Sequence, residues 1–171
     1  LTAIILTLNE ANHLPHCIAS LHTLDQIVVF DSFSTDNTIE IAKANGATVY
    51  QNRFENYAQQ RNAALAAVKS DWILFIDADE RLTPALSAEL RQVTTHAENG
   101  WEIPRHNYIF GRLTHGAGWW PDHQLRFFRQ GKAHYQRAVH EIATVEGEIG
   151  RLQHPLIHYN YDTPAQFHAK Q

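Results

Sequence analysis

Apolar and polar positions follow two alternating patterns in the first half of the chain. Short apolar runs typical of strands cover residues 2–8, 26–30, 47–50 and 71–76. Helical spacing or helix-start signals mark residues 14–21, 34–44, 56–69 and a segment that begins at Thr83. Strands separated by helices favour right-handed crossovers and parallel pairing. The pattern therefore predicts an α/β fold with a mostly parallel central sheet flanked by helices.

After Gly100 the pattern changes to aromatic-rich strands and loops punctuated by glycines. We expect one domain over residues 1–171, with a boundary near residue 100 that divides it into two halves. Thr163 and Pro164 form a helix-start signal close to the end of the chain. A helix this short is unstable alone, so we expect the domain to be truncated at its C-terminus.

Composition narrows the class of protein. The chain has 171 residues, 44% hydrophobic and 19% charged, with a formal net charge of -4, which argues against nucleic acid as a partner. Its single cysteine, Cys17, excludes an internal disulfide and favours a reducing compartment. No apolar stretch approaches the roughly 20 residues of a membrane span. We expect a cytoplasmic protein, with peripheral contact to a membrane left open.

Two carboxylates follow the most apolar strand. Asp77 and Asp79 come directly after the run from Trp72 to Ile76. Residues two apart in an extended chain project to the same side, so both side chains could share one target. Hard carboxylate oxygens suit Mg²⁺ or Mn²⁺ carrying a diphosphate, although acidic residues also simply open loops. Glu80 and Arg81 are interpreted as loop residues.

Polar residues also end the other predicted strands. Thr7, Asn9 and Glu10 follow the first strand, and Asp31 follows the second. Converging carboxylates need a cation to offset them, and a metal together with Arg61 could provide it. The chain has no glycine-rich phosphate loop, so metal and side chains would have to hold a diphosphate.

Four motifs occur together and in order in this half of the chain. They are Thr7-Leu8-Asn9-Glu10, the segment from Asp31 to Thr38, Gln60-Arg61-Asn62, and Asp77-Ala78-Asp79. This set resembles the inverting glycosyltransferases of family 2, which have the GT-A fold. Ser32 and Phe33 depart from the family's usual Asp and Gly. The second half, with the segments from Trp119 to Arg129 and from Val139 to Glu141, is similar to bacterial lipopolysaccharide core β-1,4-glucosyltransferases.

The resemblance implies that residues 1–100 form the nucleotide-binding half and residues 101–171 the acceptor half. It also implies a role for each residue on the donor side. Thr7, Glu10 and Asp31 would frame the nucleobase of a UDP-sugar, and Arg61 would meet ribose or phosphate. Asp31 could equally form a turn that caps the next helix, and Arg61 could be a solvated helix residue. For the metal, Asp79 would bind directly, Asp77 would contact ribose or metal-bound water, and His140 would complete the sphere.

Inverting sugar transfer also requires a general base for the acceptor hydroxyl. Asp122 resembles the family's acidic residue that precedes a Leu and an Arg, and Glu141 is a rival. Asp122 could instead be a turn former after Pro121. Trp119 and Trp120 are candidates for stacking on a sugar ring. Arg126 and Arg129 are candidates for meeting diphosphate or an anionic acceptor.

The function predicted is metal-dependent transfer of a sugar, glucose by the subgroup resemblance, from a UDP-sugar to a lipopolysaccharide core or related glycan or glycolipid. One alternative is a non-catalytic module that binds sugar nucleotides or glycans. The other is a phosphotransferase of the haloacid-dehalogenase type. That class places its acidic pair after the first strand and follows it with Thr, whereas here the pair follows the fourth strand and Arg81 stands at that position.

Overall fold

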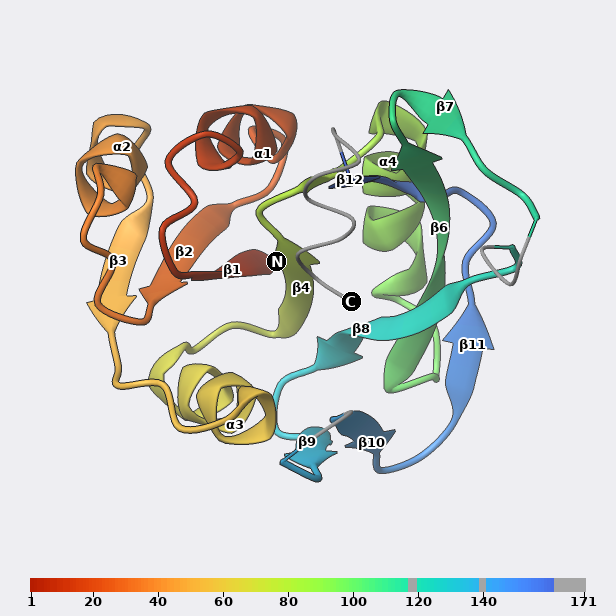
Figure 1. The fold of residues 1–171 in the computed structure, drawn as a ribbon. Coiled ribbons are helices and arrows are strands. Elements are labelled where there is room, and N and C mark those ends of the chain that lie inside the picture. Colours follow the sequence, from red (N-terminus) through yellow and green to blue (C-terminus); the bar gives the residue numbers. More distant parts are fainter. Residues whose placement is uncertain (117–119, 139–140, 162–171) are drawn as a thin grey trace.

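The computed structural model describes residues 1–116, 120–138 and 141–161 (Figure 1). Its helices are α1 (Leu14–Ser20), α2 (Thr38–Ala44), α3 (Tyr57–Ala67) and α4 (Pro84–Val93). The strands of the first half are β1 (Thr2–Thr7), β2 (Gln26–Asp31), β3 (Thr48–Gln51), β4 (Trp72–Asp77) and β5 (Glu80–Arg81). Those of the second half are β6 (Gly100–Ile109), β7 (Arg112–Leu113), β8 (His123–Arg129), β9 (Ala133–Gln136), β10 (Ile142–Val145), β11 (Ile149–Arg151) and β12 (Leu156–Tyr161).

One curled sheet joins both halves of the chain. Its strand order is β3-β2-β1-β4-β8-β6-β12-β5, with β7 and β11 also paired to β6. The pairs β3/β2, β2/β1 and β1/β4 are parallel, as expected for strands joined by helical crossovers. Strand β8 then runs antiparallel to both β4 and β6. The α/β prediction is confirmed, with a parallel first half and a mixed second half.

Strand β4 is covered on both faces, which explains its unbroken apolar run. Ile73 and Phe75 pack into a core on the side of α3, and Leu74 and Ile76 pack into a core on the side of α1 and α4. All four side chains are at most 1% exposed. Alternation along the strand thus supplies two cores from one segment.

Helix α4 begins where its sequence predicts. Thr83 is the N-cap, its hydroxyl oxygen accepts a hydrogen bond from the amide of Leu86 at 3.1 Å, and Pro84 occupies the first turn. Leu86 and Leu90 then point into the core and are fully buried. In α3 the N-cap is Asn56. Local signals therefore set the helix starts next to the sheet.

Strand β5 corrects one expectation. Glu80 and Arg81 are not loop residues, because they pair antiparallel with His158 and Ile157 of β12. This pairing places β5 at the far edge of the curled sheet although it follows β4 by only two residues. A two-residue strand has no periodic pattern, so its existence depends on a partner far along the chain.

Two further expectations can be compared with the described residues. Within them, no helix is long and apolar enough to cross a membrane. Cys17 is a buried free thiol, and burial raises the pKa of its sulfhydryl group. The helix start predicted at Thr163 and Pro164 lies outside the described residues.

Gly150 offers a test of this packing. It sits beside Trp101 in the β11/β6 ladder, and a Cβ atom there would overlap the buried indole ring. We expect Gly150→Ala to lower the free energy of unfolding by about 1–3 kcal/mol, because overpacking forces the ring to move. Urea denaturation followed by tryptophan fluorescence measures the change. The control is Gly116→Ala, where nothing lies within 4 Å of the added atom; equal stability of the two variants would contradict this packing.

Candidate active site

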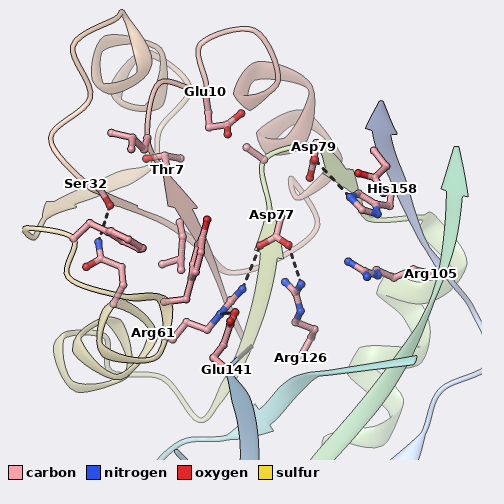
Figure 2. A pocket seen from close by; sticks show the side chains of 17 residues that line it. Thr7, Glu10, Ser32, Arg61, Asp77, Asp79, Arg105, Arg126, Glu141 and His158 are labelled. Carbon is pink, nitrogen blue, oxygen red and sulfur yellow. Dashed lines mark hydrogen bonds and ion pairs between the residues drawn. The ribbon is translucent and has the colours of Figure 1, made fainter. Parts of the chain in front are cut away.

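A cavity of about 490 Å³ lies at the carboxyl ends of β1 and β4 (Figure 2). This is the edge at which open α/β sheets place ligands. The first half contributes Leu6, Thr7, Leu8, Glu10, Ser32, Phe54, Tyr57, Gln60, Arg61, Asp77, Ala78 and Asp79 to its lining. The second half contributes Arg105, Arg126, Glu141, His158 and Asn160. Both halves of the chain therefore build one site.

Asp77 lies between two buried arginines. Its Oδ2 accepts a hydrogen bond from Nη2 of Arg126 at 2.8 Å, and its Oδ1 lies 3.5 Å from Nη2 of Arg61 (Figure 2). The Arg61 and Arg126 side chains are only 6% and 9% exposed, whereas Asp77 keeps 33% of its side-chain surface open to the cavity. Arg61 also stacks over the ring of Phe75 at 5.0 Å.

This arrangement shifts the ionisation of Asp77. Burial alone would raise the pKa of its carboxyl, but the guanidinium groups of Arg126 and Arg61 hold that pKa well below its usual range. Glu80 stabilises the backbone and the charged groups next to Asp77. It is fully buried, accepts the Asp77 amide at 2.9 Å and lies 3.2 Å from Nη1 of Arg105.

Asp79 faces a different partner. Its Oδ2 lies 3.5 Å from Nε2 of His158 on β12, at the other side of the cavity mouth (Figure 2). Asp77 and Asp79 were expected to share one target, but in the structure they contact different partners. Strand β4 ends at Asp77, so the two-residue alternation does not continue through the turn that holds Ala78 and Asp79.

The donor set near Asp79 fits a hard divalent cation only in part. No group of three or more His, Cys, Asp or Glu side chains within the described ranges could hold a metal ion by itself. A carboxylate and an imidazole 3.5 Å apart could supply two ligands to an ion that takes its others from substrate phosphates and water. His140, the metal ligand expected from sequence, lies outside the described residues.

Asp31, which was expected at the nucleobase, and Asn9, another polar residue after β1, both point away from the cavity. Asp31 is fully buried and does not line the cavity. Its oxygens accept the Thr7 hydroxyl at 2.9 Å and the Ser34 amide at 2.8 Å, which is the turn geometry of the alternative interpretation. Asn9 accepts the Thr35 amide at 2.8 Å and also braces this loop. Thr7 and Glu10 do line the cavity.

The two base candidates differ in position. Glu141 lines the cavity, and its Oε1 lies 3.4 Å from Nε of Arg61. Asp122 does not line it and is held by hydrogen bonds from Arg105, Asn107 and Gln124. Burial would raise the pKa of Asp122, but these hydrogen bonds and the charge of Arg105 lower it.

His158 and Arg105 are site residues that the sequence did not reveal. His158 stands in an apolar strand and resembles a packing residue, and Arg105 lies in a strand with no motif. Of the two arginines considered for anion binding, Arg126 reaches the site, but Arg129 stacks over Trp72 at 4.7 Å. Trp120 is 39% exposed, and Trp119 lies outside the described residues.

Comparison with known proteins agrees with this geometry. A family model described as Glycosyl transferase family 2 matches residues 2–142. The chain belongs to this family. The match covers the motifs at the ends of β1, β2 and β4, and it ends before β12, which supplies His158.

Relatives in this family are longer proteins. The chain is 33% identical over 174 residues to the lipopolysaccharide core biosynthesis glycosyltransferase LpsC of Rhizobium meliloti (strain 1021), covering 93% of this chain and 63% of LpsC. It is 39% identical over 94 residues to an uncharacterized glycosyltransferase of Rickettsia bellii (strain RML369-C), covering 54% of this chain and 32% of that protein. The chain thus spans less than two thirds of either relative.

Solved glycosyltransferases share the fold. TarS 1-349 of S. aureus superposes with a TM-score of 0.65 at 16% identity, over 98% of this chain and 62% of that one. Glucosyl-3-phosphoglycerate synthase of Mycobacterium tuberculosis, in complex with Mn²⁺, UDP-glucose and phosphoglyceric acid, gives 0.53 at 24% identity, over 62% and 43% of the two chains. These likenesses confirm the GT-A fold.

The Asp77 pairing predicts a pH-dependent contribution to stability. We expect Asp77→Asn to lower the free energy of unfolding by about 1–3 kcal/mol at pH 7, because the two buried arginines lose the counter-charge that they share and, among the described residues, keep only Glu141 at 3.4 Å from Arg61 and Glu80 at 3.8 Å from Arg126. The folded-state pKa lies below the unfolded value of about 3.9, so the contribution is complete above that pH and is lost as the pH falls below it. The difference between wild type and variant should therefore shrink below about pH 4.

Urea denaturation from pH 7 to pH 3 measures this difference. Asp71→Asn is the matched control, because Asp71 is an exposed carboxylate just before the other end of β4. A stability difference that stays constant over the whole pH range would contradict the arginine pairing.

Proposed function

We propose that this chain is the catalytic domain of a metal-dependent, inverting glycosyltransferase that uses a UDP-sugar. The observation that carries the proposal is the pair formed by Asp79 and His158 at the mouth of the cavity, 3.5 Å apart. Both residues can ligate a divalent cation, and the arginine-paired Asp77 stands next to them. Family membership supports the same reaction class.

The donor would lie along the exits of β1 and β4. Leu8, Phe54 and Tyr57 provide apolar and aromatic surface for a nucleobase, and Ser32 lies beside them. Thr7 and Glu10 remain our candidates for contacts to the base, with Asp31 holding the loop that shapes this end. Glucosyl-3-phosphoglycerate synthase, which shares the fold and was solved with UDP-glucose and Mn²⁺, supports this choice of donor and of Mn²⁺ or Mg²⁺ as cofactor.

Asp79 and His158 would hold the cation, and His140 remains a candidate for a further ligand. A cation bound there would stabilise, as a Lewis acid, the negative charge of the departing nucleoside diphosphate. Arg61 and Arg126 hold Asp77 in place and keep the protein's own negative charge at this corner neutralised. Asp77 thereby keeps a fixed, ionised oxygen at the cavity surface for a ribose hydroxyl.

We place the general base at Glu141. Glu141, Arg61 and Arg126 line both the donor cavity and a second cavity of about 380 Å³. A carboxylate between the two cavities can accept a proton from an acceptor hydroxyl that enters from the second one. Gln124 and the exposed Ile142 and Ile149 border that entrance. Asp122 was the other candidate, but it lies outside the donor cavity lining.

The acceptor we propose is a lipopolysaccharide core or a related envelope glycan. The support is the likeness to LpsC, and the choice of glucose as the sugar rests on the subgroup resemblance alone. We place the reaction in the cytoplasm, because the buried thiol of Cys17 suits a reducing compartment. A glycolipid acceptor would bring the protein to the cytoplasmic face of the inner membrane as a peripheral protein.

The alternatives differ in what supports them. A haloacid-dehalogenase-type phosphotransferase has lost its basis, because the chain belongs to another family and its acidic pair follows the fourth strand. A non-catalytic module that binds sugar nucleotides would share the cavity. It would bind UDP but release no sugar from any UDP-sugar.

Asp79 provides the direct test of the metal site. We expect Asp79→Asn to lose most Mn²⁺-dependent affinity for UDP in calorimetric titration and to lower sugar transfer by at least about 100-fold, because one of two protein ligands is removed. Circular dichroism should show an unchanged fold, and Asp71→Asn should behave as wild type. Near-normal transfer by Asp79→Asn would remove the metal role.

Glu141 provides the test of the base. We expect Glu141→Gln to lower transfer by about 10²- to 10⁴-fold while UDP affinity in the presence of Mn²⁺ stays at the wild-type level. The control is Glu146→Gln, which changes an exposed carboxylate just after β10. Unchanged turnover in Glu141→Gln would return the base assignment to Asp122.

A further inference from the structure

A chain of hydrogen bonds runs behind His158 into the protein. Nδ1 of His158 lies 2.7 Å from Oδ1 of Asn107, and Nδ2 of Asn107 donates to Oδ2 of Asp122 at 3.1 Å. Asn107 is fully buried and His158 is 8% exposed. The opposite ring nitrogen of His158, Nε2, faces Asp79. Strands β12 and β6, the turn after β4 and the loop before β8 thus meet in one line.

The direction of each hydrogen bond in this line follows from Asp122. An ionised carboxylate only accepts hydrogen bonds, so the Asn107 amide must turn its NH₂ group toward Asp122. Its carbonyl oxygen then faces His158, and a carbonyl oxygen also only accepts. Nδ1 of His158 must therefore carry the hydrogen, and in the neutral ring Nε2 carries none.

Asp122 is well suited to set this direction. Arg105 donates to its Oδ2 from Nε at 2.9 Å, and Gln124 donates to its Oδ1 at 2.8 Å. The backbone amide of Arg105 also donates to the Asp122 carbonyl at 2.8 Å. The two side-chain hydrogen bonds favour the ionised carboxylate, and the backbone bond fixes its position. The Asn107 amide therefore always faces a group that accepts hydrogen bonds.

Asp79 and His158 then present two acceptors to one another. A carboxylate oxygen and an unprotonated ring nitrogen repel at 3.5 Å unless a positive centre lies between them. A tautomer with hydrogen on Nε2 would instead donate to Asp79 and close the gap. The orientation of Asn107 therefore decides whether this pair is satisfied internally or is left open for a cation.

We propose that Asn107 and Asp122 are positioning residues that hold His158 as its Nδ1–H tautomer, so that Nε2 stays available beside Asp79 as a ligand. The identity of the cation rests on the proposed function, whereas the tautomer does not. Partners of this kind behind a ligand histidine fix ring orientation and tautomer, and their loss costs about 10- to 100-fold in metal affinity.

The first experiment reads the tautomer directly in the metal-free full chain. Nitrogen-15 NMR of histidine-labelled protein in alkaline buffer distinguishes bare from protonated ring nitrogens, and His158→Gln identifies the signals of His158. We expect hydrogen on Nδ1 and none on Nε2. In Asn107→Leu, which keeps the volume but removes the amide, hydrogen should move to Nε2, where Asp79 accepts it. Hydrogen on Nε2 in the wild type would overturn the proposal.

Two further variants separate positioning from packing. Asp122→Asn keeps the shape of the carboxylate but allows the Asn107 amide to turn, so we expect both tautomers to be populated. Gln124→Leu removes another donor to the same carboxylate and should leave the tautomer unchanged. A wild-type tautomer in Asp122→Asn would contradict the role of Asp122, since the Asn107 amide would then be oriented without its charge.

The second experiment measures Mn²⁺ affinity by electron paramagnetic resonance of free Mn²⁺, in the presence of UDP. We expect a 10- to 100-fold loss in both Asn107→Leu and Asp122→Asn, although neither residue touches the ion. Wild-type affinity in both variants would overturn the positioning role. If the wild type binds no Mn²⁺ but shows the Nδ1–H tautomer, the metal in the proposed function fails while the tautomer assignment stands.

Discussion

The site depends on one carboxylate shared by two buried guanidinium groups. Asp77 at the end of β4 pairs with Arg61 from α3 and Arg126 from β8, so it joins the parallel first half of the sheet to the antiparallel strand beside it. Two arginines this deeply buried are stable only with a counter-charge of good geometry. Asp77, the first acid of the motif, therefore has a structural role, and its pairing with the two arginines determines the position of this part of the cavity wall.

The two acids that follow Asp77 point in opposite directions. Glu80 turns inward and accepts the Asp77 amide, while Asp79 turns outward to His158 at the cavity mouth. Three acids within four residues would repel one another strongly if they faced one point. This repulsion is reduced because Asp77 pairs with Arg61 and Arg126, whereas Asp79 faces His158. Asp79 is therefore the acid of the three that faces an imidazole at the cavity instead of an arginine.

Local periodicity explains which parts of this molecule could be predicted. The strands β1 to β4 and the helices between them follow from alternation and capping, because those signals act within a few residues. Arg61, Asp77 and Asp79, which the motifs singled out, all line one cavity. His158, Arg105 and strand β5 could not be found this way, since they reach the site only through pairing between distant strands. Asp31 has the turn geometry that the sequence offered as its alternative role, because its own loop supplies hydrogen-bond donors to its carboxylate.

The late position of strand β12 in the chain affects how the protein folds during its synthesis on the ribosome. It lies beyond the region matched by the family, yet it covers the free edge of β5 and carries His158. A nascent chain that has emerged only as far as β10 already contains both acids of the motif, but β5 still lacks its partner strand β12 and His158 has not yet been made. The Asp79–His158 pair, where we propose that a cation binds, can therefore form only after one of the last and most sequence-distant pairings, that of β12 with β5.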